Sequence, residues 1–152
     1  MIFIAIRERN MQSHILVVLQ MLAITGCLYP FAQNQQNIIA LVISGFGACI
    51  AVWTLLHNRP GNFGIYPQPK LNCRLITTGP YEWMRHPMYT ALIVIMLGVA
   101  LYNYTVFNFL SLCVLILVIS RKVIIEEALL CERFPEYQHY QRHTARFIPF
   151  LL

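Results

Sequence analysis

Two long stretches without a charged side chain constrain the fold of this chain most strongly. Residues 14–31 and 38–56 contain no Lys, Arg, Asp or Glu. As an α-helix, each stretch is long enough to cross the roughly 30 Å hydrocarbon core of a bilayer. The loop between them is polar but uncharged and opens at Pro30, so it would turn the chain back across the membrane. The two stretches therefore predict two membrane-spanning helices.

A third uncharged region covers residues 88–119 and is broken near its middle by Tyr102, Asn103, Tyr104 and Asn108. We interpret it as a helical hairpin. Its limbs of about 14 to 16 residues are short for a full crossing, so we expect them to tilt within a thinned bilayer or to stop short of spanning it. The composition suits a membrane, because 58% of residues are hydrophobic and only 11% are charged. We expect an all-α, polytopic integral membrane protein with about four transmembrane helices, residues 1–152 forming one membrane domain.

All basic residues fall on one side of this four-helix arrangement, and neither loop on the other side carries a charge. Lys and Arg near helix ends are retained in the cytoplasm, so both termini and the polar segments are predicted to face the cytosol. In a bacterium this would be a multi-pass protein of the inner (plasma) membrane. The net charge of +5 then marks cytoplasmic loops, and we expect no nucleic-acid partner. The basic residues are Arg7, Arg9, Arg59, Lys70, Arg74, Arg85, Arg121, Lys122, Arg133, Arg142 and Arg146.

The N-terminal region leaves a second interpretation open. Arg7 and Arg9, an apolar run and the segment from Ile24 to Cys27 resemble a bacterial lipoprotein signal with its lipid-accepting cysteine. The bulky Leu28 after the cysteine disfavours this, and cleavage would leave the remaining topology unchanged. The five cysteines show neither CxxC nor metal-ligand spacing, so we predict neither disulfides nor a zinc site.

The densest polar cluster lies in residues 75–89, before the third predicted membrane helix. A Gly-Pro turn at residues 79–80 leads to Arg85, His86 and Tyr89 at the mouth of that helix, where a proline at position 87 suits the first turn. A helix N-terminus with Arg and His beside it is a good receptor for an anion, such as the carboxylate of an amino-acid-like ligand. The alternative is an interfacial anchor, because Trp, Tyr and Arg are common at headgroup depth.

A second cluster follows the fourth predicted helix, at residues 121–127. If that helix continues to about Arg133, Lys122 and Glu126 lie one turn apart on the same face. A glutamate so close to a membrane-embedded helix end is costly without a partner. A bound cation, a ligand ammonium or ribose hydroxyls would serve, whereas a solvated face with Glu–Lys pairing is the alternative.

The histidines do not indicate a metal ion. His139 and His143 are four residues apart, but no third ligand is evident in a segment rich in tyrosine and basic residues. His14 and His57 lie near the ends of predicted helices, which leaves a haem with two histidine ligands open.

Together, these clusters resemble a known family. The pattern GPYxxxRHPxY, then two short hydrophobic helices, a Glu-Glu pair and an aromatic tail ending in Pro, is similar to the isoprenylcysteine carboxyl methyltransferases and their phospholipid methyltransferase relatives. The resemblance covers about residues 58–150, and the order, spacing and membrane setting of its motifs make it specific. Its parts are residues 75–89, the pair Glu126-Glu127, residues 134–140 and residues 146–149.

The resemblance implies a pocket for S-adenosylmethionine between the loop before the third helix and the C-terminal segment, with a lateral opening for a lipid-tailed substrate. Lys122 would touch the substrate where the family carries Arg, which weakens the case for a bidentate grip on a carboxylate. Neighbouring Arg121 could substitute, although it points in another direction, and Arg85 and Glu127 complete the catalytic candidates. The residues implied to contact the cofactor are Cys73, Arg74, Leu75, Ile76, Tyr81, His86, Pro87, Met88, Tyr89 and Glu126.

The predicted activity is carboxyl O-methylation of an isoprenylcysteine-like or other hydrophobic, lipid-attached acceptor. A carboxylate is already ionised at neutral pH, so alignment of the reacting atoms and exclusion of water would suffice. One alternative is phospholipid N-methylation, in which the amine must first lose a proton to Glu126, Glu127 or His86. A non-catalytic membrane protein, associated with haem or quinone or acting as a scaffold, is the other. The acceptor and the oligomeric state stay open.

Overall fold

The computed structural model of the chain describes residues 2–29, 37–58, 62, 64–68 and 73–149, and its ordered elements are helices. Over these residues there is no β-strand, and one isolated parallel bridge pairs Met84 with Ala145. The predicted all-α class is therefore confirmed. The helices are α1 (Ile2–Leu28), α2 (Ile38–His57), α3 (Pro80–Trp83), α4 (Pro87–Asn103), α5 (Val106–Arg133) and α6 (Tyr137–His143).

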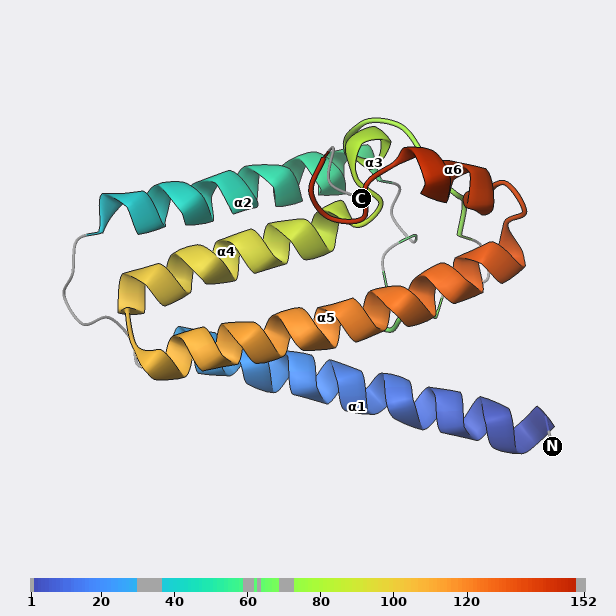
Figure 1. Cartoon of the computed structure of the whole chain (residues 1–152), viewed down its shortest axis with the longest axis horizontal. Helices are drawn as coiled ribbons and strands as arrows, with labels where there is room; N and C mark the ends of the chain where they lie inside the picture. The colour runs from blue at the N-terminus through green and yellow to red at the C-terminus, as the bar shows by residue number, and fades with distance from the viewer. Residues whose placement is uncertain (1, 30–36, 59–61, 63, 69–72, 150–152) are drawn as a thin grey trace.

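The four long helices lie side by side, in the order α2, α4, α5, α1 from top to bottom of Figure 1. The closest pairings are α2 with α4 and α1 with α5, and α4 also packs on α5. The short helices α3 and α6 and the C-terminal segment gather at one end of the bundle, where α1 begins (Figure 1). The turn between α4 and α5 lies at the opposite end (Figure 1). The polar segments are thereby collected at one end.

Three of these helices are long and apolar enough to cross a membrane: α1 from Met11, α2, and α5. Helix α4 is shorter, at 17 residues, as expected for the first limb of the predicted hairpin. The second limb is longer than the uncharged region predicted for it, because α5 has 28 residues and continues to Arg133, the continuation that places Lys122 and Glu126 one turn apart on one face. One unbroken helix therefore runs from the apolar part of the bundle into the polar end, and it carries Lys122 and Glu126 there.

The asparagines that interrupt the third apolar region close the end of α1. The chain turns at Tyr104, which is left-handed with φ 49°, and Thr105 caps α5 through its side chain. Asn108 lies inside α5, where its buried amide donates to the carbonyl oxygens of Gly26 (3.0 Å) and Cys27 (2.8 Å) and to that of Tyr29. Asn103 also donates to Cys27, at 3.1 Å. These amides satisfy carbonyls that a helix C-terminus leaves free, at a depth where unpaired groups are costly.

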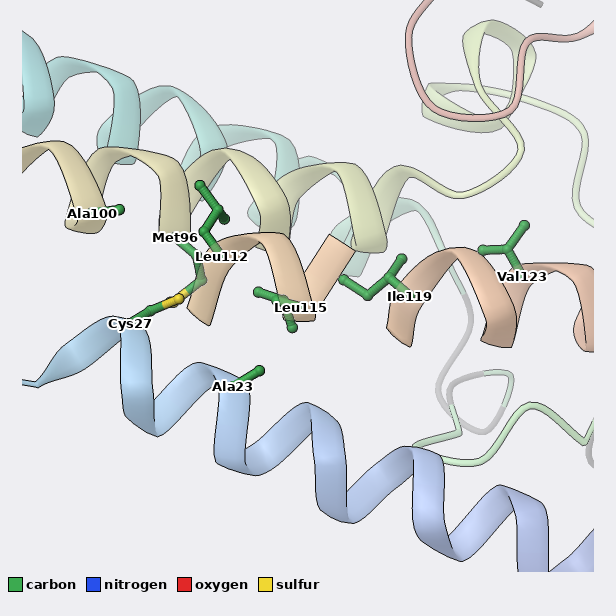
Figure 2. Close-up of a cluster of buried hydrophobic side chains, with 8 residues drawn as sticks. All are labelled: Ala23, Cys27, Met96, Ala100, Leu112, Leu115, Ile119 and Val123. Atoms are coloured by element: carbon green, nitrogen blue, oxygen red, sulfur yellow. The ribbon is translucent and has the colours of Figure 1, made fainter. Parts of the chain in front are cut away.

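The buried core lies between α1, α4 and α5 (Figure 2). Cys27 packs there as a small apolar side chain, whereas Cys49 and Cys113 are exposed on α2 and α5, and all are free thiols. The core follows the inner face of α5 as far as Val123, next to the first polar residue of the site. Its members are Ala23, Cys27, Met96, Ala100, Leu112, Leu115, Ile119 and Val123.

Helices α2 and α4 meet through glycines. A Cβ added at Gly98 would lie 2.6 Å from the carbonyl oxygen of Ala40 and 2.7 Å from the backbone nitrogen of Ser44. Close approach of this kind through small residues is how membrane helices pack in the absence of a hydrophobic driving force. The pairing fixes α4, and with it the start of α4, where the site lies.

Gly98→Ala should destabilise the protein by about 1–3 kcal/mol, because the new methyl group meets backbone atoms that cannot move aside. Thermal unfolding in detergent measures the effect. The matched control is Gly45→Ala on α2, where an added Cβ has nothing within 4 Å. That variant should unfold at or slightly above the wild-type temperature, since alanine favours a helix over glycine by about 1 kcal/mol. Equal unfolding temperatures for the two variants would contradict the close packing.

Candidate functional site

A cavity of about 520 Å³ opens at the polar end of the bundle. Its walls come from α1, α2, α4 and α5, from residues 62, 64–68 and 73–76, and from α3 and α6. The two polar clusters that the sequence singles out therefore meet in one place. This volume lies in the range of sites that hold small molecules and cofactors.

The predicted site residues lie around this cavity, with one exception. All ten predicted cofactor contacts line it, as do Arg85 and Lys122. Glu127 is not among the described residues that line it. The structure thus brings the groups together, and their chemical roles stay predictions. The lining cofactor candidates are Cys73, Arg74, Leu75, Ile76, Tyr81, His86, Pro87, Met88, Tyr89 and Glu126.

Glu126 and Tyr89 join the two sides of the cavity. The Tyr89 hydroxyl on α4 donates to Oε2 of Glu126 on α5 at 3.1 Å. The His86 ring stacks on Tyr89 with a centroid distance of 5.7 Å and an interplanar angle of 27°. Among the described residues, the second carboxylate oxygen of Glu126 accepts no hydrogen bond, while Lys122 and His86 act on the charge of the group. A carboxylate beside a cavity with one oxygen that accepts no hydrogen bond is suited to hold a cation or a hydroxyl of a ligand.

Lys122 is only 1% exposed, yet it has no ion-pair partner in the described part of the chain. Its Nζ donates to Oε1 of Gln20 on α1 at 2.6 Å and to the carbonyl oxygen of Ile65 at 2.8 Å. It also lies 5.5 Å from the centroid of the Tyr89 ring. The hydrogen bonds of this buried cation go to neutral groups, and its nearby counter-charge is the Glu126 carboxylate. An anion in the cavity would stabilise it further. Arg121, the possible substitute, is exposed and does not line the cavity.

Glu127 lies behind the cavity wall at the centre of a buried polar cluster. Its Oε1 accepts from Arg85 Nε at 2.7 Å and faces His86 Nε2 at 3.2 Å. Its Oε2 accepts from Arg146 at 2.8 Å and Gln141 at 3.2 Å. We call this group the Glu127 cluster. Both carboxylate oxygens are occupied, so the arrangement ties the start of α4, helix α5 and the C-terminal segment together.

The C-terminal segment is also fixed by backbone contacts to the start of α4. The backbone nitrogens of Arg85 and His86 donate to the carbonyl oxygens of Ala145 (2.8 Å) and Arg146 (3.2 Å). The Arg85 guanidinium donates to the carbonyls of Gln141 (2.7 Å) and Thr144. Three of the five N–H donors of Arg85, on Nε and Nη1, are therefore engaged by the protein, which favours a structural part for it in shaping the cavity.

The loop before α3 is held by two asparagines that follow the end of α2. The side-chain oxygen of Asn62 accepts a hydrogen bond from the Arg74 backbone N–H at 3.1 Å, and its amide nitrogen donates to the Arg74 carbonyl oxygen at 3.0 Å. Asn58 donates to the Tyr81 hydroxyl at 2.8 Å. Burial raises the pKa of Tyr81 to about 12, and the charge of Glu126 adds to the rise, while the Asn58 hydrogen bond opposes it. Tyr81 is therefore a neutral phenol at physiological pH, and its hydrogen remains for an acceptor in the cavity.

Gly79 is needed at the turn into α3. Its φ of 61° lies in the left-handed region, and a Cβ there would fall 2.6 Å from the His57 ring. His57 in turn bonds Thr78 through Nε2 at 2.9 Å, and His14 packs edge-on against Tyr66 at 4.9 Å. Both histidines near the helix ends thus have protein contacts.

Several cavity residues were missed in the sequence. Gln20, a lone amide inside an apolar run, is the clearest missed signal, because polar residues within membrane helices are usually functional. Asn58 and Asn62 lie in the polar region but belong to no motif, and Tyr137 belongs to the aromatic tail without an assigned role. Arg59 and Lys70, two of the basic residues used for the topology, lie outside the described residues. Among the described residues, no three His, Cys, Asp or Glu side chains gather as a metal site would require.

Two comparisons with known proteins show what the chain is similar to. A family model described as phospholipid methyltransferase matches residues 35–137, more than half of the chain. The chain is also similar to the nickel-cobalt-cadmium resistance protein NccN of Alcaligenes xylosoxydans xylosoxydans. The two are 30% identical over 87 residues, which are 56% of this chain and 40% of that protein. The chain therefore spans well under two thirds of this relative.

Proposed function

This chain belongs to the phospholipid methyltransferase family, whose members use S-adenosylmethionine, and from that premise we propose that it methylates the carboxylate of a hydrophobic, lipid-attached acceptor. An isoprenylcysteine is the model acceptor. The observation that carries the methyltransferase assignment is that the GPYxxxRHPxY segment and Glu126 line the same cavity. The observation that favours a carboxylate is the buried Lys122.

The residues around the cavity fit this cofactor. Glu126 offers one unused carboxylate oxygen to a cation or to ribose hydroxyls, and Tyr89 orients the other oxygen. The flat side chains of Tyr81, Phe134 and Tyr140 give an apolar wall suited to a purine. When bound, S-adenosylmethionine would supply a methyl group activated by a sulfonium.

The acceptor would lie near Lys122. This ammonium shares the cavity with Met21 of α1 and Leu92 of α4, which are apolar side chains from the membrane-embedded helices. A positive charge there attracts a carboxylate and repels the ammonium of an amine acceptor. A carboxylate acceptor needs no proton removed, which suits a site where the Glu127 carboxylate and the His86 Nε2 are already engaged with each other.

Two classes of labelled product separate the proposed reaction from the alternatives. Purified protein in lipid is incubated with methyl-labelled S-adenosylmethionine and either N-acetyl-S-farnesylcysteine or phosphatidylethanolamine vesicles. We expect label in the cysteine derivative that is released by mild base, because esters hydrolyse and N-methyl groups do not. Base-stable label in the phospholipid would instead establish N-methylation. A visible absorption spectrum of the purified protein tests the haem alternative.

Replacing Lys122 by Met should raise the KM for the farnesylcysteine acceptor about tenfold. This is the loss in affinity expected when one of the weaker hydrogen bonds to a charged group is removed. The dissociation constant for S-adenosylhomocysteine should stay within about twofold, since the cofactor contacts are untouched. Arg121→Met is the matched control, because the adjacent cation is exposed. If Lys122→Met left the KM unchanged, the carboxylate would be bound elsewhere.

We also propose that the cavity faces the cytosol, where S-adenosylmethionine is made. The support is the distribution of basic residues: Arg74, Arg85, Lys122 and Arg146 surround the cavity or its wall at the same end of the bundle. Labelling of Cys73 by a membrane-impermeant maleimide tests this in intact cells and inverted vesicles. Reaction only in the vesicles is expected.

A further inference from the structure

Gln20 places a polar side chain in the middle of the membrane-spanning part of α1. It is the one polar residue between Ile15 and Ile24, and it is only 7% exposed. It lies three residues before Ala23, whose side chain points toward α5 (Figure 2), so it belongs to the inner face of α1. Helix α1 precedes residues 35–137, which the family model matches. A buried amide at this depth is costly, so its presence calls for a functional explanation.

The contact with Lys122 fixes which way the amide of Gln20 faces. Lys122 Nζ donates to Oε1 of Gln20 at 2.6 Å. An ammonium group can only donate, so the amide oxygen must lie on the side of Lys122 and the amide nitrogen, Nε2, on the other. Among the described residues, Nε2 donates to no acceptor, yet it is not one of the fully buried atoms without a partner. Because Gln20 lines the cavity, a ligand there can accept a hydrogen bond from Nε2.

Lys122 also keeps a donor for the cavity. Two of its three N–H groups donate to Gln20 and to the carbonyl oxygen of Ile65, and the third has no hydrogen-bond acceptor in the described part of the chain. The free donors of Lys122 and Gln20 are therefore carried by two side chains in direct contact, and both side chains line the cavity. A carboxylate is planar and has two acceptor oxygens, so a pair of neighbouring donors can bind it in a two-pronged geometry.

We propose that Gln20 is a specificity-determining residue of the acceptor site, where its amide nitrogen donates to one oxygen of the acceptor carboxylate while Lys122 binds the other. This rests on the proposed function. Lys122 supplies the charge, and Gln20 supplies a second, neutral donor whose direction Lys122 fixes. A methyl ester has no anionic oxygen, so the pair should hold the acceptor more tightly than the methylated product.

Gln20→Glu is a sharp test, because it separates the two halves of the amide. A glutamate keeps an oxygen for Lys122, but it replaces the donor by an anionic oxygen that repels the acceptor carboxylate. In the full-length protein in lipid, with S-adenosylmethionine saturating, the KM for N-acetyl-S-farnesylcysteine should rise at least about tenfold, as for a lost hydrogen bond to a charged group. The kcat should not fall, because the lost contact is stronger to the carboxylate than to the forming ester.

Two further variants and one further ligand frame the measurement. Gln20→Met removes the whole amide without adding a charge, so it should raise the KM less than Gln20→Glu does. Gln12→Glu adds the same charge at an exposed position of the same helix and should keep the wild-type KM. Inhibition by the methyl ester of N-acetyl-S-farnesylcysteine should change far less in the Gln20 variants than the KM does. The dissociation constant for S-adenosylhomocysteine should stay at the wild-type value in all three variants.

Three results with an active wild-type protein would overturn the inference. The first is an unchanged KM in Gln20→Met, because the donor would then contribute nothing. The second is a raised KM in Gln20→Met with a wild-type KM in Gln20→Glu, which would reduce Gln20 to holding Lys122 through its oxygen. The third is an equal loss of affinity for S-adenosylhomocysteine, which would mean a disturbed cavity.

Failure of the proposed function gives a different result. A wild-type protein that binds S-adenosylhomocysteine but forms no base-labile methyl ester of N-acetyl-S-farnesylcysteine would contradict the proposed function, and the inference about Gln20 would fall with it. The three results above, in contrast, leave the wild-type reaction intact.

Discussion

Replacing Glu127 by Ala is expected to destabilise the protein by about 3–5 kcal/mol, the cost of removing one partner from a buried ion pair. The side chains of Arg85 and Glu127 are 7% and 4% exposed, so the variant would leave the Arg85 charge buried without its counter-ion. Arg146 adds less, because its side chain is 41% exposed. The apparent unfolding temperature in detergent should fall by on the order of 10 °C.

The control for this variant lies on the same helix. Glu132→Ala changes an exposed glutamate one turn and a half further along α5 and should stay within about 0.5 kcal/mol of wild type. A drop of less than about 2 °C for Glu127→Ala would show that the Glu127 cluster contributes little to the fold. Glu127 would then return to the list of candidates for the chemistry.

Glu126→Gln should have the opposite effect, with the fold retained and cofactor binding weakened. The amide oxygen can still accept from Tyr89, so the unfolding temperature should stay near that of wild type. Loss of the charge should weaken S-adenosylhomocysteine binding and slow methyl transfer at subsaturating cofactor by about 10- to 150-fold, as for a hydrogen bond to a charged group. Isothermal titration and initial rates measure the two effects.

Glu132→Gln again serves as the matched control and should behave as wild type in both assays. If Glu126→Gln bound the cofactor normally, Glu126 would have no part in holding it. If it bound normally but methylated more slowly, its part would be with the acceptor.

The two adjacent glutamates illustrate what the sequence could and could not predict. The spacing of Lys122 and Glu126 predicted one helix face, and α5 presents both to the same cavity. The sequence also paired Glu126 with Glu127, but neighbours on a helix are rotated by about 100°. Glu127 therefore meets Arg85 and Arg146 behind the wall. Which of two adjacent carboxylates faces a ligand depends on how the C-terminal segment folds back, and no local pattern encodes that.

The apolar regions also contain features that the sequence could predict and features that it could not. Uncharged stretches of sufficient length predicted the membrane helices, because the bilayer imposes that length. The polar breaks were harder to interpret. Asn103 and Asn108 indicated only a break between the two limbs of a helical hairpin. The turn occupies Tyr104 and Thr105, and the two amides bind carbonyls at the C-terminal end of α1. Their partners are about 80 residues away in the chain, beyond the reach of any periodicity.

The central claim is that the turn before α4 and the face of α5 enclose one site for a charged methyl donor. Titration of the wild-type protein with S-adenosylhomocysteine, in detergent and again in lipid, tests it most directly. Saturable binding of one ligand per chain, weakened in both His86→Ala and Glu126→Ala, is the predicted result. Absence of saturable binding in both media would contradict the claim.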